Sequence, residues 1–169
     1  LTINIFNTKR EGAAKCRNRA NSLATGDIIA VCDADFYNPE RSTAINEFFK
    51  RNKDKSIFYS GLDLRSASHP SDVWYMDAVE WDFNSKCPIS HPTVAYRKKV
   101  ATEIKYPEES VETDLYEFFL IEAHKKGYLF GGCQNPLMVK IEGDTQRDRS
   151  EARELKIKKY EEYGIEVLM

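Results

Sequence analysis

The sequence predicts an α/β protein, and two observations carry this prediction. Segments with the apolar pattern of strands are interspersed with segments whose apolar residues recur at helical spacing, which is typical of a mixed sheet flanked by helices. Two carboxylates, Asp33 and Asp35, directly follow the apolar run at residues 28–32. The carboxyl ends of strands are where open α/β sheets bind their ligands. The pattern therefore favours a sheet with a polar site at one edge.

The first half of the chain divides into alternating predicted elements. Residues 1–6 alternate apolar and polar side chains, as a half-buried strand does. From Ala13 to Leu23 the apolar spacing is helical, and Gly26 is expected to close this helix. The run at 28–32 predicts a buried strand, followed by a helix at 40–51 and a strand at 56–60.

The second half contains the least regular segment, residues 61–90. Its two tryptophans, Trp74 and Trp81, favour a ligand-binding loop. Further on, the pattern predicts a strand at 92–97, a helix at 113–126, short strands at 128–130 and 137–141, and a highly charged helix at 145–163.

Length and charge limit the function classes. A chain of 169 residues is most simply a single domain, and a net charge of −2 gives no general attraction to nucleic acid or anionic membranes. No apolar stretch is long enough to span a bilayer. The four cysteines are scattered, which argues against a zinc knuckle and favours free, mostly buried thiols in a reducing cytoplasm.

The tripeptide Asp33-Ala34-Asp35 is the strongest local signal of chemistry. Side chains two residues apart on extended backbone point the same way, so both carboxylates can reach one ligand. Two acids held this close repel each other unless a positive charge lies between them, and carboxylate oxygens suit Mg²⁺ or Mn²⁺. The alternative is a solvated loop with two surface acids.

Several motifs, in their order and spacing, resemble glycosyltransferase family 2, whose members have the GT-A (Rossmann-like) fold. A helix carrying Arg17 and Asn18 precedes a Gly-Asp turn at residues 26–27, a strand and Asp33-Ala34-Asp35. Residues 90–97 resemble the segment before the acceptor site, residues 112–115 resemble the acidic motif with the catalytic base, and residues 140–144 resemble the strand and turn that close the site.

The resemblance implies a metal-dependent inverting transferase. It would move a sugar from a nucleotide-diphosphate sugar, by analogy with the family a uridine-diphosphate (UDP) sugar, to a hydroxyl of a glycan or lipid-linked acceptor. Mn²⁺ or Mg²⁺ would neutralise the leaving diphosphate. Asp35 would bind the metal directly, and Asp33 would bind the metal or the ribose. Arg17 would contact the nucleotide, unless it is a solvated helix charge.

The same resemblance indicates candidates for the base and a further metal ligand. Asp114 is the expected general base, unless it only caps the following helix. The family usually shows adjacent Glu-Asp, whereas Thr113 intervenes here, so Glu112 is a rival base. Glu142 stands where many family members place a histidine that reaches the metal; it is either a ligand or a surface residue.

Acceptor and nucleotide contacts complete the expected site. Trp74 and Trp81 could stack on an acceptor sugar, or they could fill the core. His91 is a further acceptor-binding candidate, although a histidine in such a place more often packs or hydrogen-bonds. Asn18 is expected either to contact the nucleotide or to pack and bond a turn.

One part of the family pattern precedes the segment that begins at Leu1, so the fold is expected to be incomplete at the N-terminus. Residues 1–60 would be the remaining nucleotide- and metal-binding part, 61–145 the acceptor and catalytic part, and 146–169 a C-terminal helix. The strand at 1–6 would expose a sheet edge through which a homo-oligomer could form. A lipid-linked acceptor would place the protein at the inner face of a membrane.

Two other functions compete with the transferase. A domain without its full nucleotide half could be a binding or scaffold module. A strand followed by Asp-x-Asp also resembles the haloacid-dehalogenase-type phosphatases, with Asp33 as nucleophile and Asp35 as acid/base, but Tyr37 does not fit their pattern.

Overall fold

The computed structural model describes residues 11–33, 36–66, 73–76, 83, 87–110, 113–142 and 150–165. These residues form an α/β fold around one mixed sheet, which confirms the predicted class. The predicted strand at 1–6 lies outside the described residues. None of the helices within the described ranges has the length and apolar character needed to cross a bilayer.

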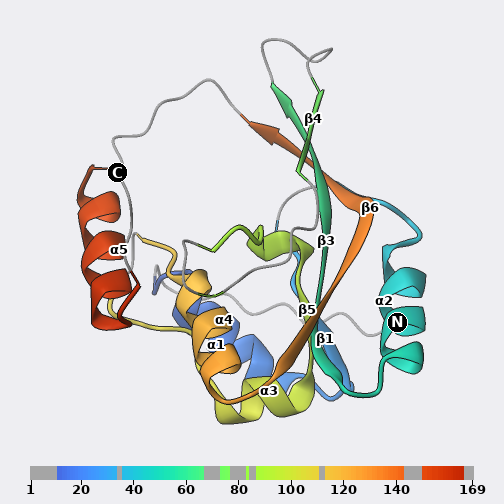
Figure 1. The fold of residues 1–169 in the computed structure, drawn as a ribbon, viewed down its shortest axis with the longest axis horizontal. Helices are drawn as coiled ribbons and strands as arrows, with labels where there is room; N and C mark the ends of the chain where they lie inside the picture. The colour runs from blue at the N-terminus through green and yellow to red at the C-terminus, as the bar shows by residue number, and fades with distance from the viewer. Residues whose placement is uncertain are drawn as a thin grey trace.

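The sheet has six described strands in the order β1-β5-β3-β6-β2, with β4 paired to β3 (Figure 1). The long strands β3 and β6 run parallel at its centre, and the other pairs are antiparallel. The strands are β1 (Ile28–Ala30), β2 (Phe36–Tyr37), β3 (Lys55–Ser66), β4 (Val73–Met76), β5 (Ala95–Arg97) and β6 (Leu129–Glu142).

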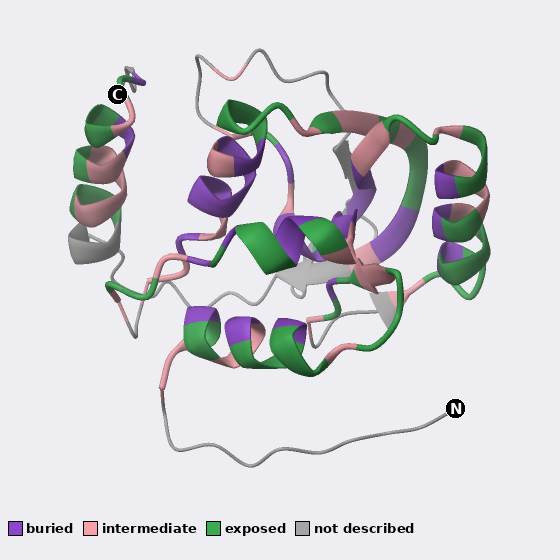
Figure 2. Cartoon of the chain, turned by 90° about the horizontal axis from the view of Figure 1, so that it is seen from below, coloured by how far each residue is buried: buried purple, intermediate pink, exposed green. Residues whose placement is uncertain are grey.

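Helices cover both faces of this sheet. Helix α2 (Arg41–Arg51) lies on one side in Figure 1, and the remaining helices lie on the other. These are α1 (Ala13–Leu23), α3 (Lys98–Glu103), α4 (Tyr116–Lys125), α5 (Ser150–Glu162) and the short 3₁₀ helix η1 (His91–Thr93). In Figure 2 the buried residues of the helices lie mainly on their inner sides and the exposed ones outside.

Alternation along β3 divides the core in two, because successive side chains of a strand point to opposite faces. Ile57 and Tyr59 belong to the larger cluster, under α1, α3 and α4. Phe58, between them, belongs to the smaller cluster with Ile45 and Phe49 of α2. The apolar residues between Ser56 and Ser60 therefore pack into the cores on both faces of the sheet.

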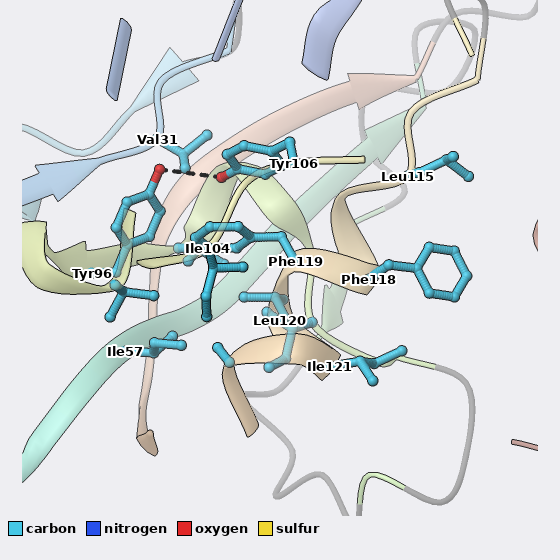
Figure 3. Packing of buried hydrophobic residues seen from close by; sticks show 14 of the residues in the cluster. Val31, Ile57, Tyr96, Ile104, Tyr106, Leu115, Phe118, Phe119, Leu120 and Ile121 are labelled. Atoms are coloured by element: carbon cyan, nitrogen blue, oxygen red, sulfur yellow. Dashed lines mark hydrogen bonds between the residues drawn. The ribbon is translucent and has the colours of Figure 1, made fainter. Parts of the chain in front are cut away.

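Helix α4 forms the centre of the larger cluster (Figure 3). Its residues 118–121 are almost fully buried, and burying each such side chain contributes about 1.5–3 kcal/mol before the entropy cost. Helix α5 packs on α4 through the ring of Tyr160 against Phe118 and through an ion pair between Lys156 and Glu117 at 2.7 Å. These contacts fix the start of α4, next to Asp114.

The structure corrects several predicted boundaries. β3 continues to Ser66 and pairs with β4, so the segment expected to be irregular is partly sheet. The two short strands expected at 128–130 and 137–141 are one strand, β6. The ladder shifts register where Gly61 pairs with Pro136, and the strand continues past the proline. A proline is tolerated at such a bulge because its missing N–H removes no regular ladder bond.

The other differences concern helices and burial. Helix α4 begins at Tyr116, later than predicted, and α3 was not predicted. Helix α5 is described from Ser150, and the first residues of the helix predicted at 145–163 lie outside the described residues. The strand expected from residue 92 begins at Ala95, after η1. Strand β1 is only partly buried, because β5 is its one partner among the described strands. No disulfide joins the four cysteines, as expected, but none of them is fully buried and Cys32 is exposed.

Candidate functional site

The end of β1 is held in place by backbone and side-chain hydrogen bonds. The N–H of Val31 donates to the carbonyl of Val94 at 3.0 Å, which extends the contact between β1 and the segment before β5. Two residues later, the N–H of Asp33 donates to the hydroxyl of Tyr37 at 2.8 Å. The backbone of Asp33 is therefore fixed from two sides, while its carboxylate is 37 % exposed.

Arg41 anchors the same region from α2. Its Nη2 faces the carbonyl oxygens of Val31, Pro92 and Val94 at 2.8, 3.1 and 3.4 Å. The guanidinium also lies over the ring of Tyr37, 4.6 Å from its centroid. Burial lowers the pKa of Arg41, yet an arginine remains charged at any ordinary pH. This buried cation ties the end of β1 to the 92–94 segment and supports the tyrosine that holds Asp33.

Sequence reasoning did not find Arg41, although a signal was present. Arg41, Ile45 and Phe49 are spaced four residues apart, so they lie on one face of α2, and all three are buried. An arginine on the apolar face of a helix points to a buried set of acceptors, because a buried charge needs partners.

Arg17 brings the predicted acids together. From α1, its Nη1 donates to both carboxylate oxygens of Asp114, at 2.7 and 2.8 Å, and its Nη2 lies 3.4 Å from Oδ1 of Asp33. Burial alone would lower the pKa of Arg17, but the charge and hydrogen bonds of Asp114, with a smaller contribution from Asp33, raise it overall. Three residues predicted from separate motifs thus form one cluster.

The side chain of Asp114 does not cap helix α4. Leu115 occupies the N-cap position of α4, and no side chain makes a capping hydrogen bond there. Both oxygens of Asp114 instead accept from Arg17, and the carboxylate is 37 % exposed. Asp114 is therefore a carboxylate that faces Arg17 and remains open to solvent.

Asn18 fixes α1 against the segment that leads to Asp114. Its amide accepts from the N–H of Tyr106 at 2.9 Å and donates to the carbonyl of the same residue at 3.0 Å. It also donates to the carboxylate of Glu108 at 2.7 Å. These bonds favour the turn-bonding role that the sequence left open for Asn18. A contact with the nucleotide stays a prediction.

Beneath Arg17 lies a buried chain of hydrogen bonds that the sequence did not reveal. The hydroxyl of Tyr96 donates to Oδ1 of Asn21 at 2.9 Å, so Tyr106 must donate to Tyr96 across their 3.2 Å contact, the bond drawn in Figure 3. Nε2 of His91 lies 2.9 Å from the hydroxyl of Tyr106 and must therefore carry the proton. Nδ1 of His91 has no partner and is the unprotonated nitrogen.

His91 is consequently neutral and hidden. Burial lowers the pKa of His91 well below its usual value, and the charge of Arg17 lowers it further. With 2 % of its surface exposed, the ring supports Tyr106, over which the guanidinium of Arg17 lies at 5.6 Å. The expected contact of His91 with the acceptor substrate stays a prediction, and it would require the ring to become exposed.

The remaining predicted residues can be placed only in part. Trp74 pairs with Leu64 in the β3–β4 ladder, and Glu142 pairs with Ser66 at the end of the β3–β6 ladder, but their side chains are not described. Asp35, Glu112 and Trp81 lie outside the described residues.

The fit of a metal ion rests on the donor chemistry of Asp33. Its partly exposed carboxylate at the end of β1 is a suitable ligand for Mg²⁺ or Mn²⁺. Within the described ranges, no group of three acidic, histidine or cysteine side chains could hold a metal. Any further ligands must come from water, from a bound substrate or from residues such as Asp35.

Comparison with known protein families identifies one family. The model of glycosyl transferase family 2 matches residues 3–104, more than half of the chain. The chain belongs to glycosyl transferase family 2. The matched range of this family 2 chain contains Arg17, Asp33 and Arg41, and it ends before Asp114.

A distant relative supports the same family. An uncharacterized glycosyltransferase of Methanocaldococcus jannaschii is 23 % identical over 126 residues, which are 70 % of this chain and 43 % of the relative. The chain thus spans less than half the length of the relative that it matches.

Proposed function

We propose that this protein is a metal-dependent inverting glycosyltransferase. The observation that carries the proposal is the convergence of Arg17, Asp33 and Asp114 on one place at the end of β1. Two carboxylates and one guanidinium, all reached by solvent, suit a ligand that combines a cation with a phosphorylated group. Membership of family 2 makes a nucleotide-sugar the first candidate.

The donor side of the site is formed by the segment after β1. A bound Mn²⁺ or Mg²⁺ would act as a Lewis acid on the leaving diphosphate. We assign its coordination to Asp35, with Asp33 as a second ligand or as an acceptor for the ribose hydroxyls and with Glu142 as a further candidate. Arg17 would bind the nucleotide diphosphate through its N–H groups. A UDP-sugar is the proposed donor.

The acceptor side is formed by the start of α4 and by the aromatic segment. The acceptor oxygen forms a bond to the anomeric carbon while the bond from that carbon to the diphosphate breaks, which inverts the configuration. The hydroxyl proton passes to Asp114, or to Glu112 if that residue is the base. Trp74 and Trp81 would present flat faces to a glycan or lipid-linked acceptor. A lipid-linked acceptor would bring the enzyme to the cytoplasmic face of a membrane.

Titration calorimetry with a panel of UDP-sugars, with and without Mn²⁺, tests this proposal. We expect binding that requires the metal and is lost in Asp35→Ala and weakened in Asp33→Ala. Asp54→Ala is the matched control, because Asp54 is an exposed acid that forms an ion pair with the neighbouring Lys55 at 3.7 Å. Metal-independent binding, or equal binding in all variants, would contradict the proposed site. Binding without any transfer would favour a binding module.

A further inference from the structure

We propose that Asp114 and the donor diphosphate compete for Arg17, so that donor binding releases the carboxylate that serves as base. The inference rests on the proposed function and adds a link between the two halves of the reaction. Without the donor, Arg17 holds Asp114; with the donor, the guanidinium turns to the phosphate oxygens.

The geometry of the Arg17–Asp114 pair is the first support. One nitrogen of Arg17 donates to both oxygens of Asp114, at 2.7 and 2.8 Å. Hydrogen bonds from a cation stabilise the charged form of a carboxylate and occupy its lone pairs. Both oxygens of Asp114 already face the Arg17 guanidinium, so an acceptor hydroxyl cannot take that place while the pair is formed. Asp114 can act as base only after this pair has loosened.

The position of Arg17 between two acids is the second support. Its other terminal nitrogen already lies 3.4 Å from Asp33, on the side where the donor is proposed to bind. A modest side-chain rotation would therefore carry the guanidinium from one end of the site to the other. The rotation involves the Arg17 side chain alone, and the hydrogen bonds of Asn18 to the backbone of Tyr106 hold the backbone of α1 in place.

Charge and exposure are the third support. Two carboxylates facing one guanidinium leave one net negative charge, so a single cation cannot satisfy both acids and a diphosphate at once. The side chain of Arg17 is itself 18 % exposed between the two carboxylates, so an incoming anion can reach it from the solvent. Guanidinium groups bind phosphate oxygens as readily as carboxylates, in the same forked geometry.

Competition makes an unusual prediction: removing the charge of the proposed base should improve donor binding. Calorimetry with UDP in saturating Mn²⁺ would compare the wild type with Asp114→Asn. We expect UDP to bind about two- to fivefold more tightly to the variant, since a partly exposed ion pair contributes up to roughly 1 kcal/mol, which is about fivefold when 1.4 kcal/mol is tenfold. Asp54→Asn is the control for an exposed acid elsewhere and should leave the affinity unchanged.

A second pair of variants separates competition from a general charge effect. In an Arg17→Met background, Asp114→Asn should no longer change UDP affinity, because the shared guanidinium is gone. Thermal unfolding would verify that each variant is folded, and Arg17→Gln, which also removes the charge, replaces Arg17→Met if the latter is not. Equal or weaker binding to Asp114→Asn, or the same gain in both backgrounds, would overturn the inference alone. If neither the wild type nor Asp114→Asn binds UDP, the proposed function fails as well.

Discussion

Replacing Arg41 by methionine should both destabilise the fold and impair the site. Nη2 of Arg41 has two protons and faces three buried carbonyl oxygens, so it makes about two good hydrogen bonds and one shared bond. The side chain is buried, at 7 % exposure, and methionine can fill much of the same volume. The variant therefore tests the charge and its hydrogen bonds more than the packing.

The magnitude follows from opposing contributions. Two hydrogen bonds from a cation are worth roughly 1.5–3 kcal/mol each, and the carbonyls of Val31 and Pro92 lose this donor in a buried place. Removing a buried charge recovers part of its desolvation cost, about several kcal/mol in real proteins. We expect a net loss of about 2–4 kcal/mol in the free energy of unfolding.

Urea denaturation followed by circular dichroism measures this loss, and Arg51→Met is the matched control. Arg51 belongs to the same helix, but its side chain is 78 % exposed and its partner is Glu47, at 2.9 Å. A surface pair of this kind contributes about 0.3–0.5 kcal/mol. If Arg41→Met is as stable as Arg51→Met, Arg41 does not anchor the end of β1, and the account of how Asp33 is positioned is wrong.

Three further substitutions test other parts of the structure. His91→Gln should make the free energy of unfolding less sensitive to acid, because folding depresses the pKa of His91 and the unfolded chain therefore takes up the proton first as pH falls. Between pH 6.5 and 5.5 the wild type should lose about 1 kcal/mol more than the variant in the free energy of unfolding. Parallel curves of stability against pH for the two proteins would contradict a neutral, buried ring. Asn18→Ala should cost about 2–3 kcal/mol in urea denaturation because it leaves the buried N–H of Tyr106 unpaired, and a loss below about 0.5 kcal/mol would count against this link. Gly131→Ala should cost about 1–3 kcal/mol by thermal or urea unfolding, since its Cβ would lie 2.5 Å from the ring of Phe48, and an unchanged stability would show that the ring moves aside freely.

The sequence was sufficient where one local pattern decided the structure. Apolar spacing predicted α1 and α2 to within a few residues, and α2 buries Ile45 and Phe49 of its predicted stripe. Helix α1 instead buries Ala14, Asn18 and Asn21, whereas Leu23 of its predicted stripe is exposed. Strand β6 was predicted as two short strands, at 128–130 and 137–141, and the segment between them contains Gly132 and Pro136, which favour turns. Pairing with β3 overrides that tendency and absorbs the proline in a register shift.

Residues of the candidate site could be singled out from the sequence, but the contacts between them could not be predicted. Arg17, Asp33 and Asp114 were each singled out from their motifs, and their roles stay predictions. Their direct contact depends on how α1 packs against the segment between α3 and α4, and Arg17 and Asp114 are 97 positions apart. Tyr106 was missed because nothing in its neighbourhood in sequence marks it. Its importance arises only from the buried side chains of His91, Tyr96 and Asn18 that meet it in the fold.

The most direct test of the central claim is the anomalous scattering of Mn²⁺ in crystals of the protein grown with UDP. The account predicts a peak within bonding distance, about 2.2 Å, of a carboxylate oxygen of Asp33 or Asp35, with the diphosphate next to Arg17 at the end of β1. A peak bound elsewhere on the protein, or UDP bound away from Arg17, would contradict it.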